Sequence, residues 1–311
     1  MLGSFTLKLD GVSCPACGSG ELNHLIVKPS DKKGGDPIPL RECRNCVFAW
    51  QWPAQSDFLK SVAHASQRYT SDQENEYYKD ERRKAVAQHQ IEYVKDLHPK
   101  GETILDVGSG DGAFAAVAAE AGWRSIGIDP AMPRESEGNP ILRMATLQDL
   151  DDGEEFDVVT LWDVIEHLDS PCDVLEQAAR HVAPGGWLIV ETGNYQSLER
   201  VQAGGTWWAY AADHRWYFTP SIVRHALEAQ GLSGAVLAPR VLRPNADKKK
   251  KPRASVWRAI RKAPKGIVEM RLELQRNAQI RSALAEWPDW YHLSIFTAAA
   301  QKPSIPFEPS A

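Results

Sequence analysis

The stretch ILDVGSGDGAF, from Ile104 to Phe114, decides the fold of this chain. An apolar run leads into three glycines and an alanine-rich run follows them, which is the order strand, tight turn, helix. Gly108, Gly110 and Gly112 permit positive φ angles and let a ligand approach the backbone closely. The helix that follows directs unpaired N–H groups at the turn. We therefore expect a ligand to bind against this loop.

Apolar runs alternate with helical stretches along most of the chain. Strands are expected at TILDVG, RSIGIDP, FDVVTLWDV, WLIVETG, GAVLAPRVL and YHLSIFTAA, and helices at 57–98, 112–122, 171–186 and 219–231. Thr219 or Ser221 is expected to cap the last of these helices. Such alternation is typical of a doubly wound α/β fold, in which helices cover both faces of a parallel sheet.

An acidic residue, Asp129, ends the second predicted strand. A carboxylate at this point can accept hydrogen bonds from two ribose hydroxyls, so the loop and Asp129 predict a pocket for an adenosine-containing ligand. A dinucleotide site would have the spacing G-x-G-x-x-G, whereas this loop has G-x-G-x-G preceded by Asp106. An NAD-type site with an altered fingerprint and a glycine turn without a ligand are the alternatives.

The D-x-G-x-G-x-G sequence resembles the first motif of class I S-adenosylmethionine (SAM) methyltransferases. LWDVIEHLDSP, HVAPGGWLIVETGNYQS and DHRWYFTP resemble later motifs of a bacterial branch that carries an N-terminal zinc ribbon. The resemblance implies a Rossmann-like, seven-stranded and mostly parallel sheet whose last two strands pair as an antiparallel hairpin. It also implies SAM as cofactor, with contacts from Asp106, Gly108, Ser109, Gly110, Gly112, Asp129, Pro130, Leu147, Trp162 and Asp163.

Two histidines are the predicted catalytic residues. Methyl transfer requires in-line geometry, and an oxygen nucleophile also needs a base. His167 lies in LWDVIEH and His214 in the aromatic-rich loop GGTWWAYAADHRWYFTP. In the branch that this sequence resembles, such a loop covers the substrate pocket, where aromatic faces could stack on a sugar or a flat ring. The alternatives are that His167 buttresses the next helix and that the aromatic residues only pack a lid. Asp163, Glu166, His167 and His214 also resemble the metal-binding set of small-RNA 3′-terminal 2′-O-methyltransferases, where a divalent metal lowers the pKa of the nucleophile.

Four of the five cysteines form two Cys-x-x-Cys pairs, Cys14 with Cys17 and Cys43 with Cys46. This spacing favours tetrahedral zinc, and four sulfurs leave no open coordination position, so the predicted zinc is structural. The alternative is a set of buried cysteines without a metal. Cys172 stands apart from both pairs.

The predicted organisation is a zinc ribbon at 1–53, a helical segment at 54–98 that covers the cofactor site, a methyltransferase domain at 99–303 and a tail at 304–311. A basic helical insertion is expected at 243–287, before the last strand. From Arg243 to Arg281 there are 13 Lys or Arg against three acids, a net charge of +10. The whole chain has a net charge of −5, so the rest of the chain has a net charge of −15. Such charge suits an anionic small substrate, nucleic acid, an anionic membrane surface or a solvated dimer arm.

The leading functional prediction is a cytoplasmic SAM-dependent methyltransferase that acts on a small-molecule or glycan-type acceptor, at a hydroxyl oxygen. The chain has 311 residues, no apolar run near the ~18 that a membrane span needs, and no secretory signal at its start. The alternatives are an RNA-directed or metal-dependent 2′-O-type methyltransferase and a non-catalytic SAM-binding regulatory protein.

Overall fold

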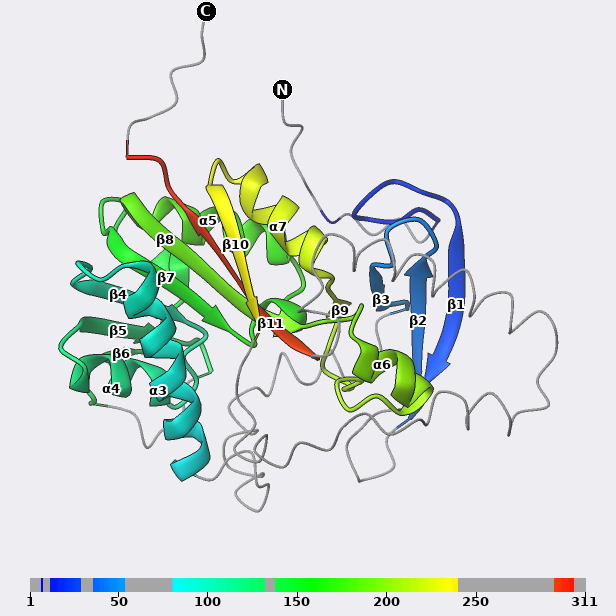
Figure 1. Ribbon diagram of the computed structural model, residues 1–311, viewed down its shortest axis with the longest axis horizontal. Helices are drawn as coiled ribbons and strands as arrows, with labels where there is room; N and C mark the ends of the chain where they lie inside the picture. The colour runs from blue at the N-terminus through cyan, green and yellow to red at the C-terminus, as the bar shows by residue number, and fades with distance from the viewer. Residues whose placement is uncertain are drawn as a thin grey trace, which may run out of the picture.

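The computed structural model in Figure 1 contains two β-sheets, one large and one small. The residues that it describes are 7, 12–28, 36–53, 80–131, 138–239 and 294–304. Among these residues, no helix combines the length and the apolar character needed to cross a membrane.

The large sheet has seven strands in the order β10-β11-β8-β7-β4-β5-β6. Their bounds are β4 (Thr103–Val107), β5 (Arg124–Ile128), β6 (Leu142–Arg143), β7 (Phe156–Trp162), β8 (Val182–Gly193), β10 (Ser233–Pro239) and β11 (Ile295–Gln301). The five strands from β4 to β8 are parallel, and β11 pairs antiparallel with both β8 and β10. The predicted Rossmann-like sheet with an antiparallel last pair is therefore confirmed.

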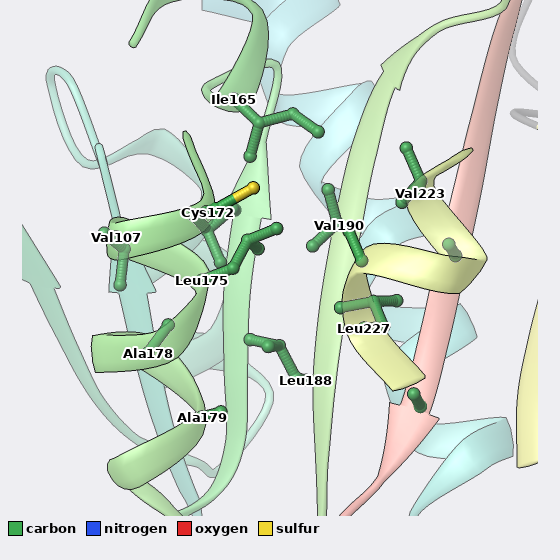
Figure 2. Packing of buried hydrophobic residues seen from close by; sticks show 14 of the residues in the cluster. Val107, Ile165, Cys172, Leu175, Ala178, Ala179, Leu188, Val190, Val223 and Leu227 are labelled. Carbon is green, nitrogen blue, oxygen red and sulfur yellow. The ribbon is translucent and has the colours of Figure 1, made fainter. Parts of the chain in front are cut away.

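Helices cover both faces of this sheet, because successive strand residues point to opposite sides. On one face, Ile104 and Val158 pack with α3 (Asp80–Leu97) and α4 (Ala113–Glu120). On the other face, the core includes the helices α5 (Pro171–Arg180) and α7 (Pro220–Ala229). Figure 2 shows this second core, where Leu175, Ala178, Leu188, Val190 and Leu227 meet.

The predicted helix at 57–98 is present as α3 over its described part, and 54–79 lies outside the described residues. Its buried face carries Ala87, Ile91 and Val94, at helical spacing. α3 lies against α4, the helix that follows the glycine loop (Figure 1). The helix thus packs beside the predicted cofactor loop.

The predicted helix at 171–186 is wrong in its last six residues. α5 ends at Arg180, and β8 begins at Val182. The backbone of Gly185 donates to the carbonyl of Lys302 at 2.9 Å, and Lys302 donates back to Gly186 at 2.9 Å. These long-range bonds to the chain after β11 draw the segment into the sheet.

The small sheet contains β1 (Leu22–Val27), β2 (Ile38–Cys43), β3 (Ala49–Gln51) and β9 (Trp216–Tyr217), in that order. All of its pairings are antiparallel. We call the described residues from 12 to 53 the ribbon. β9 belongs to the aromatic-rich loop, which the sequence placed over the substrate pocket and not in a sheet. The loop therefore joins the ribbon to the part of the chain that carries the large sheet.

The predicted basic insertion, 243–287, lies outside the described residues, but the chain on either side of it is placed. Because β10 runs parallel to β8, Pro239 lies at the sheet edge where β4, β7 and β8 end. Ile295 starts β11 opposite Gly193, at that same edge. Both ends of the segment 240–293 therefore leave from the edge that carries the glycine loop.

Candidate active site

The glycine loop joins β4 to α4 and has little room for side chains. Gly108, Gly110 and Gly112 have φ angles of 71°, 58° and 83°, in the left-handed region that favours glycine. A Cβ on Gly108 would lie 2.7 Å from Cγ2 of Val164, and one on Gly112 would lie 2.6 Å from Cδ1 of Leu142. The loop therefore requires glycine at these two positions, and the Gly108 contact places it beside the segment that follows β7.

Two buried acids lie beneath this loop. Asp106 accepts a hydrogen bond from Oγ1 of Thr160 at 2.8 Å, and burial raises the pKa of Asp106 to about 7. Asp129 accepts from the backbone N–H of Gly110 at 2.9 Å and of Ala131 at 2.7 Å. Burial also raises the pKa of Asp129. Since a carboxylate has about four acceptor positions, Asp129 can fix the loop and still accept from a ligand hydroxyl.

The remaining predicted cofactor residues lie in the loop itself or at and after the ends of β5, β6 and β7. Oγ of Ser109 and Nε1 of Trp162 are buried, and neither has a hydrogen-bond partner within the described part of the chain. The ring of Trp162 lies 5.2 Å from that of Phe114, the second residue of α4. Leu147 is buried and Pro130 exposed. The two unpartnered polar atoms, the glycine backbone and the buried acids fit a polar ligand such as SAM.

The two predicted catalytic histidines lie together at the end of β7. Their rings are 4.7 Å apart and meet edge to face at 81°. One ligand atom from each of Glu166, His167 and His214 lies within 4.8 Å of the others. Asp163, the fourth residue of the predicted metal set, is not part of this group, although it lies three residues before Glu166. The structure thus brings three of the four residues together.

Burial and neighbouring charge control the protonation of Glu166. This carboxyl is 3% exposed and accepts from Oγ1 of Thr192 at 2.8 Å. Burial, and then the charge of Asp163, raise the pKa of Glu166 to about 8. Burial therefore favours the uncharged form of Glu166, and a bound cation would favour its ionised form.

No sequence pattern marks Asp213, which contacts His167. Nδ1 of His167 lies 3.1 Å from the main-chain oxygen of Asp213 and 3.5 Å from its Oδ2. Asp213 stands directly before His214 in the quoted loop, but its distance from His167 in the sequence hides this contact. Five of the six aromatic residues in that loop are buried, and only Trp208, at 49%, is exposed. Their burial favours the packing interpretation over stacking on a substrate.

The four paired cysteines form a second compact cluster, within the ribbon. Sγ of Cys14 lies 3.6 Å from that of Cys46, and Sγ of Cys17 lies 3.5 Å from that of Cys43. Tetrahedral zinc with Zn–S bonds of about 2.3 Å places its sulfurs roughly 3.8 Å apart. The neighbouring sulfurs raise the pKa of Cys46 and lower that of Cys43. The donor set therefore fits a zinc ion.

Several known proteins are similar to this chain in sequence. An enzyme of Hydrogenovibrio crunogenus, named ubiquinone biosynthesis O-methyltransferase, is 33% identical over 128 residues, which cover 34% of this chain and 50% of the relative. A protein of the same name from Azorhizobium caulinodans is 31% identical over 174 residues, covering 49% and 67%. The chain spans half to two thirds of the length of these relatives.

A solved structure shows the shared fold. It is the 1,6-didemethyltoxoflavin-N1-methyltransferase of Burkholderia thailandensis with bound S-adenosylhomocysteine, at a TM-score of 0.51 and 13% identity. The match covers 91% of this chain and 99% of that one. Residues 78–235, about half of the chain, also match a family described as "Methyltransferase domain". The chain therefore belongs to this methyltransferase family.

Proposed function

We propose that this enzyme transfers the methyl group of SAM to a hydroxyl oxygen of a small molecule in a biosynthetic pathway. The observation that carries the proposal is the group formed by Glu166, His167 and His214. Glu166 and His167 lie in the turn after β7, just beyond Val164, which lies against Gly108. Relatives named ubiquinone biosynthesis O-methyltransferase support an oxygen acceptor. A glycan hydroxyl would suit the same chemistry.

The cofactor residues have separate tasks in this proposal. Bound SAM supplies a methyl carbon on a positively charged sulfur, which an oxygen nucleophile displaces in line. Asp129 would accept from the ribose hydroxyls while it holds the loop through Gly110. Asp106, buried under the loop, would lie near the methionine part of SAM. The positive charge of the bound cofactor would stabilise the ionised form of this carboxyl. The N–H groups at the start of α4 would face the same ligand.

His167 is the base in this proposal. With a proton on Nδ1, donated to the main-chain oxygen of Asp213, His167 presents the lone pair of Nε2. As the acceptor oxygen bonds to the methyl carbon, the C–S electron pair stays on sulfur and the hydroxyl proton passes to Nε2. His214, 4.7 Å from His167 between ring centres, would orient the acceptor or help to hold this proton.

A metal-dependent version is the second candidate, because the same three residues can coordinate a divalent cation. Glu166 and the two histidines would then be ligands, and the cation would lower the pKa of the acceptor hydroxyl. The pKa of Glu166, which burial and the charge of Asp163 raise, fits this version as well, because a bound cation would favour the ionised carboxylate. The two versions exclude each other for His167, since one nitrogen cannot be both base and ligand.

We also infer that Cys14, Cys17, Cys43 and Cys46 hold a structural zinc. The sulfur distances and the absence of an open coordination position support this role. Zinc measured by elemental analysis should approach one equivalent in the wild-type protein and fall on replacement of Cys43 by Ser. An equal zinc content in both proteins would contradict the assignment.

Transfer of labelled methyl groups into a fractionated metabolite pool tests the reaction. We expect a labelled methyl ether, and we expect His167→Ala to lower kcat at least about 100-fold, the contribution of a general base. The affinity for S-adenosylhomocysteine should stay within about twofold, because His167 is not assigned to the cofactor. Label on nitrogen or carbon, or undiminished turnover by His167→Ala, would refute the proposal.

Chelation separates the two versions. EDTA treatment should leave activity intact if His167 is a base, whereas Mg²⁺ or Mn²⁺ should restore lost activity if Glu166 and the histidines bind a metal. Zinc content is measured in the same sample, so that loss of the ribbon metal is not mistaken for loss at the active site.

The loop assignment has a matched pair of variants. Gly108→Ala places a Cβ against Val164, whereas Gly122 has a similar φ of 95° but no atom within 4 Å of its Cβ position. Both variants strain the backbone, but only Gly108→Ala should displace the loop. We expect at least about tenfold weaker binding of S-adenosylhomocysteine, or ~1.4 kcal/mol, for Gly108→Ala alone. Calorimetry that finds equal affinities would argue against the cofactor loop.

A further inference from the structure

Gln51, the last residue of β3, reaches from the ribbon to the loop that carries His214. Its side chain is fully buried, and its Nε2 donates a hydrogen bond to the main-chain oxygen of Ala212 at 2.9 Å. Its backbone N–H donates to the carbonyl of Arg215, also at 2.9 Å. One ribbon residue therefore fixes the loop on both sides of Asp213 and His214.

The opposite side of this short segment contacts the proposed transfer site. The backbone N–H of Arg215 donates to the carbonyl of Glu166 at 2.7 Å. The main-chain oxygen of Asp213 lies 3.1 Å from Nδ1 of His167. Residues 212–215 therefore lie between the ribbon and the Glu166–His167 turn, and both sides hold them through their backbone.

The ribbon and the aromatic-rich loop are also joined by contacts other than the hydrogen bond from the Gln51 side chain. β3 and β9 already pair through Ala49 with Tyr217 and Trp50 with Trp216. Phe48 stacks on Trp216 at 5.9 Å between ring centres. These contacts secure the strand but end before His214 is reached. The amide of Gln51 extends the attachment to Ala212, two residues before His214.

We propose that Gln51 is a positioning residue for methyl transfer, which makes the ribbon a structural part of the acceptor side of the active site. This role in transfer rests on the proposed function of His167 and His214. Loss of the side-chain donor would leave the carbonyl of Ala212 without this partner, and the loop would sample other conformations. His214 and the oxygen of Asp213 that holds His167 would then be in place for a smaller fraction of the time.

Two substitutions test separately the length of the Gln51 side chain and its hydrogen-bond donor. Gln51→Asn keeps a buried amide but shortens the side chain by one methylene, and Gln51→Leu removes the donor while keeping much of the volume. Gln301→Leu is the matched control, because Nε2 of Gln301 donates to the carbonyl of Gly185 at 2.8 Å. Gln301 pairs with Trp187, near the start of β8 and far from its carboxyl end, so the same kind of bond is lost away from the site.

Hydrogen exchange followed by mass spectrometry is the first measurement, because it needs no acceptor. We expect peptides that contain Arg215 to exchange about three- to tenfold faster in both Gln51 variants, which corresponds to the loss of one hydrogen bond. The exchange rate of these peptides should be unchanged in Gln301→Leu. S-adenosylhomocysteine should bind all four proteins with the same Kd. Unchanged exchange at Arg215 in both Gln51 variants would overturn the proposal, whatever the acceptor proves to be.

Kinetics is the second measurement, with the hydroxyl acceptor that the labelling screen identifies. Both Gln51 variants should lower kcat about three- to tenfold, with the KM for SAM unchanged, because the defect lies in the placement of the histidines. Faster exchange together with a wild-type kcat would show that Gln51 holds the loop without contributing to methyl transfer. That result would overturn the catalytic part of the proposal. If the enzyme uses no hydroxyl acceptor, the proposed function fails while the exchange result still decides whether Gln51 holds the loop.

Discussion

Asp106 lies at the end of β4 with 2% of its surface exposed. Its burial raises its pKa from the usual 3.8 to about 7. Between these two pH values the folded protein holds a proton that the unfolded chain has lost. The free energy of unfolding must therefore fall as the pH rises from about 4 through about 7. A buried acid under the glycine loop thus lowers the stability of the cofactor-free enzyme at neutral pH.

Asp106→Asn should remove this dependence, because an amide keeps an acceptor for Thr160 but does not ionise. Between pH 5 and pH 8, we expect the variant to lose about 2–4 kcal/mol less of its unfolding free energy than the wild type. Urea denaturation without cofactor measures this, with the exposed Asp152→Asn as control. Part of the dependence should remain, since the pKa of Glu166 is also raised, to about 8. Parallel pH curves for Asp106→Asn and wild type would contradict the assignment.

The arrangement of residues within one short motif could be predicted from the sequence. The glycine loop and Asp129 were found because a strand, a turn and a helix follow one another in an order that fixes their geometry. Glu166, His167 and His214 were grouped by resemblance, and the structure places their ligand atoms together. Gln51 could not be found this way. It lies 161 residues from Ala212, and no local pattern marks that contact.

At the scale of elements, local signals located the helices but left some boundaries and pairings open. The pattern predicted α7 with either Thr219 or Ser221 as its cap, and the structure selects Thr219, whose side chain accepts from the backbone N–H of Ile222 at 3.4 Å. β9 has only two residues, and its partner, β3, is more than 150 residues earlier. Such pairings depend on the whole fold, so periodicity could not reveal that the aromatic-rich loop joins the ribbon sheet.

The selected cap gives a test at this scale. Thr219→Ala should lower the free energy of unfolding by about 1 kcal/mol, because a helix N–H loses its acceptor. Ser221→Ala is the comparison, since Oγ of Ser221 contacts Oγ1 of Thr219 at 3.1 Å without capping the helix. We expect less than half the loss for Ser221→Ala in chemical denaturation. A larger loss of stability for Ser221→Ala than for Thr219→Ala would contradict the assignment of Thr219 as the cap.

At the scale of the whole molecule, the ribbon and the methyltransferase fold share one hydrophobic core. Cys14, Cys43 and Phe48 belong to the same buried cluster as Leu175 of α5 and Leu227 of α7. Buried contacts of this kind couple the folding of the parts that they join. In Figure 1 the ribbon lies beside α6 (Leu198–Ala203) and β9, to the right of the large sheet. A metal bound in the ribbon would therefore stabilise both parts.

Cys43→Ser tests this coupling. Cys43 is fully buried, and its loss should remove the proposed zinc and lower the free energy of unfolding of the entire chain by more than about 3 kcal/mol, because metal binding contributes directly to folding. Tryptophan fluorescence and far-UV circular dichroism should report one shared transition at a lower denaturant concentration. Cys172→Ser is the control, since Cys172 is buried in the same core but lies outside the sulfur cluster, and it should keep its zinc. Two separate transitions in Cys43→Ser, with the later one at the wild-type midpoint, would show that the ribbon folds independently of the enzyme.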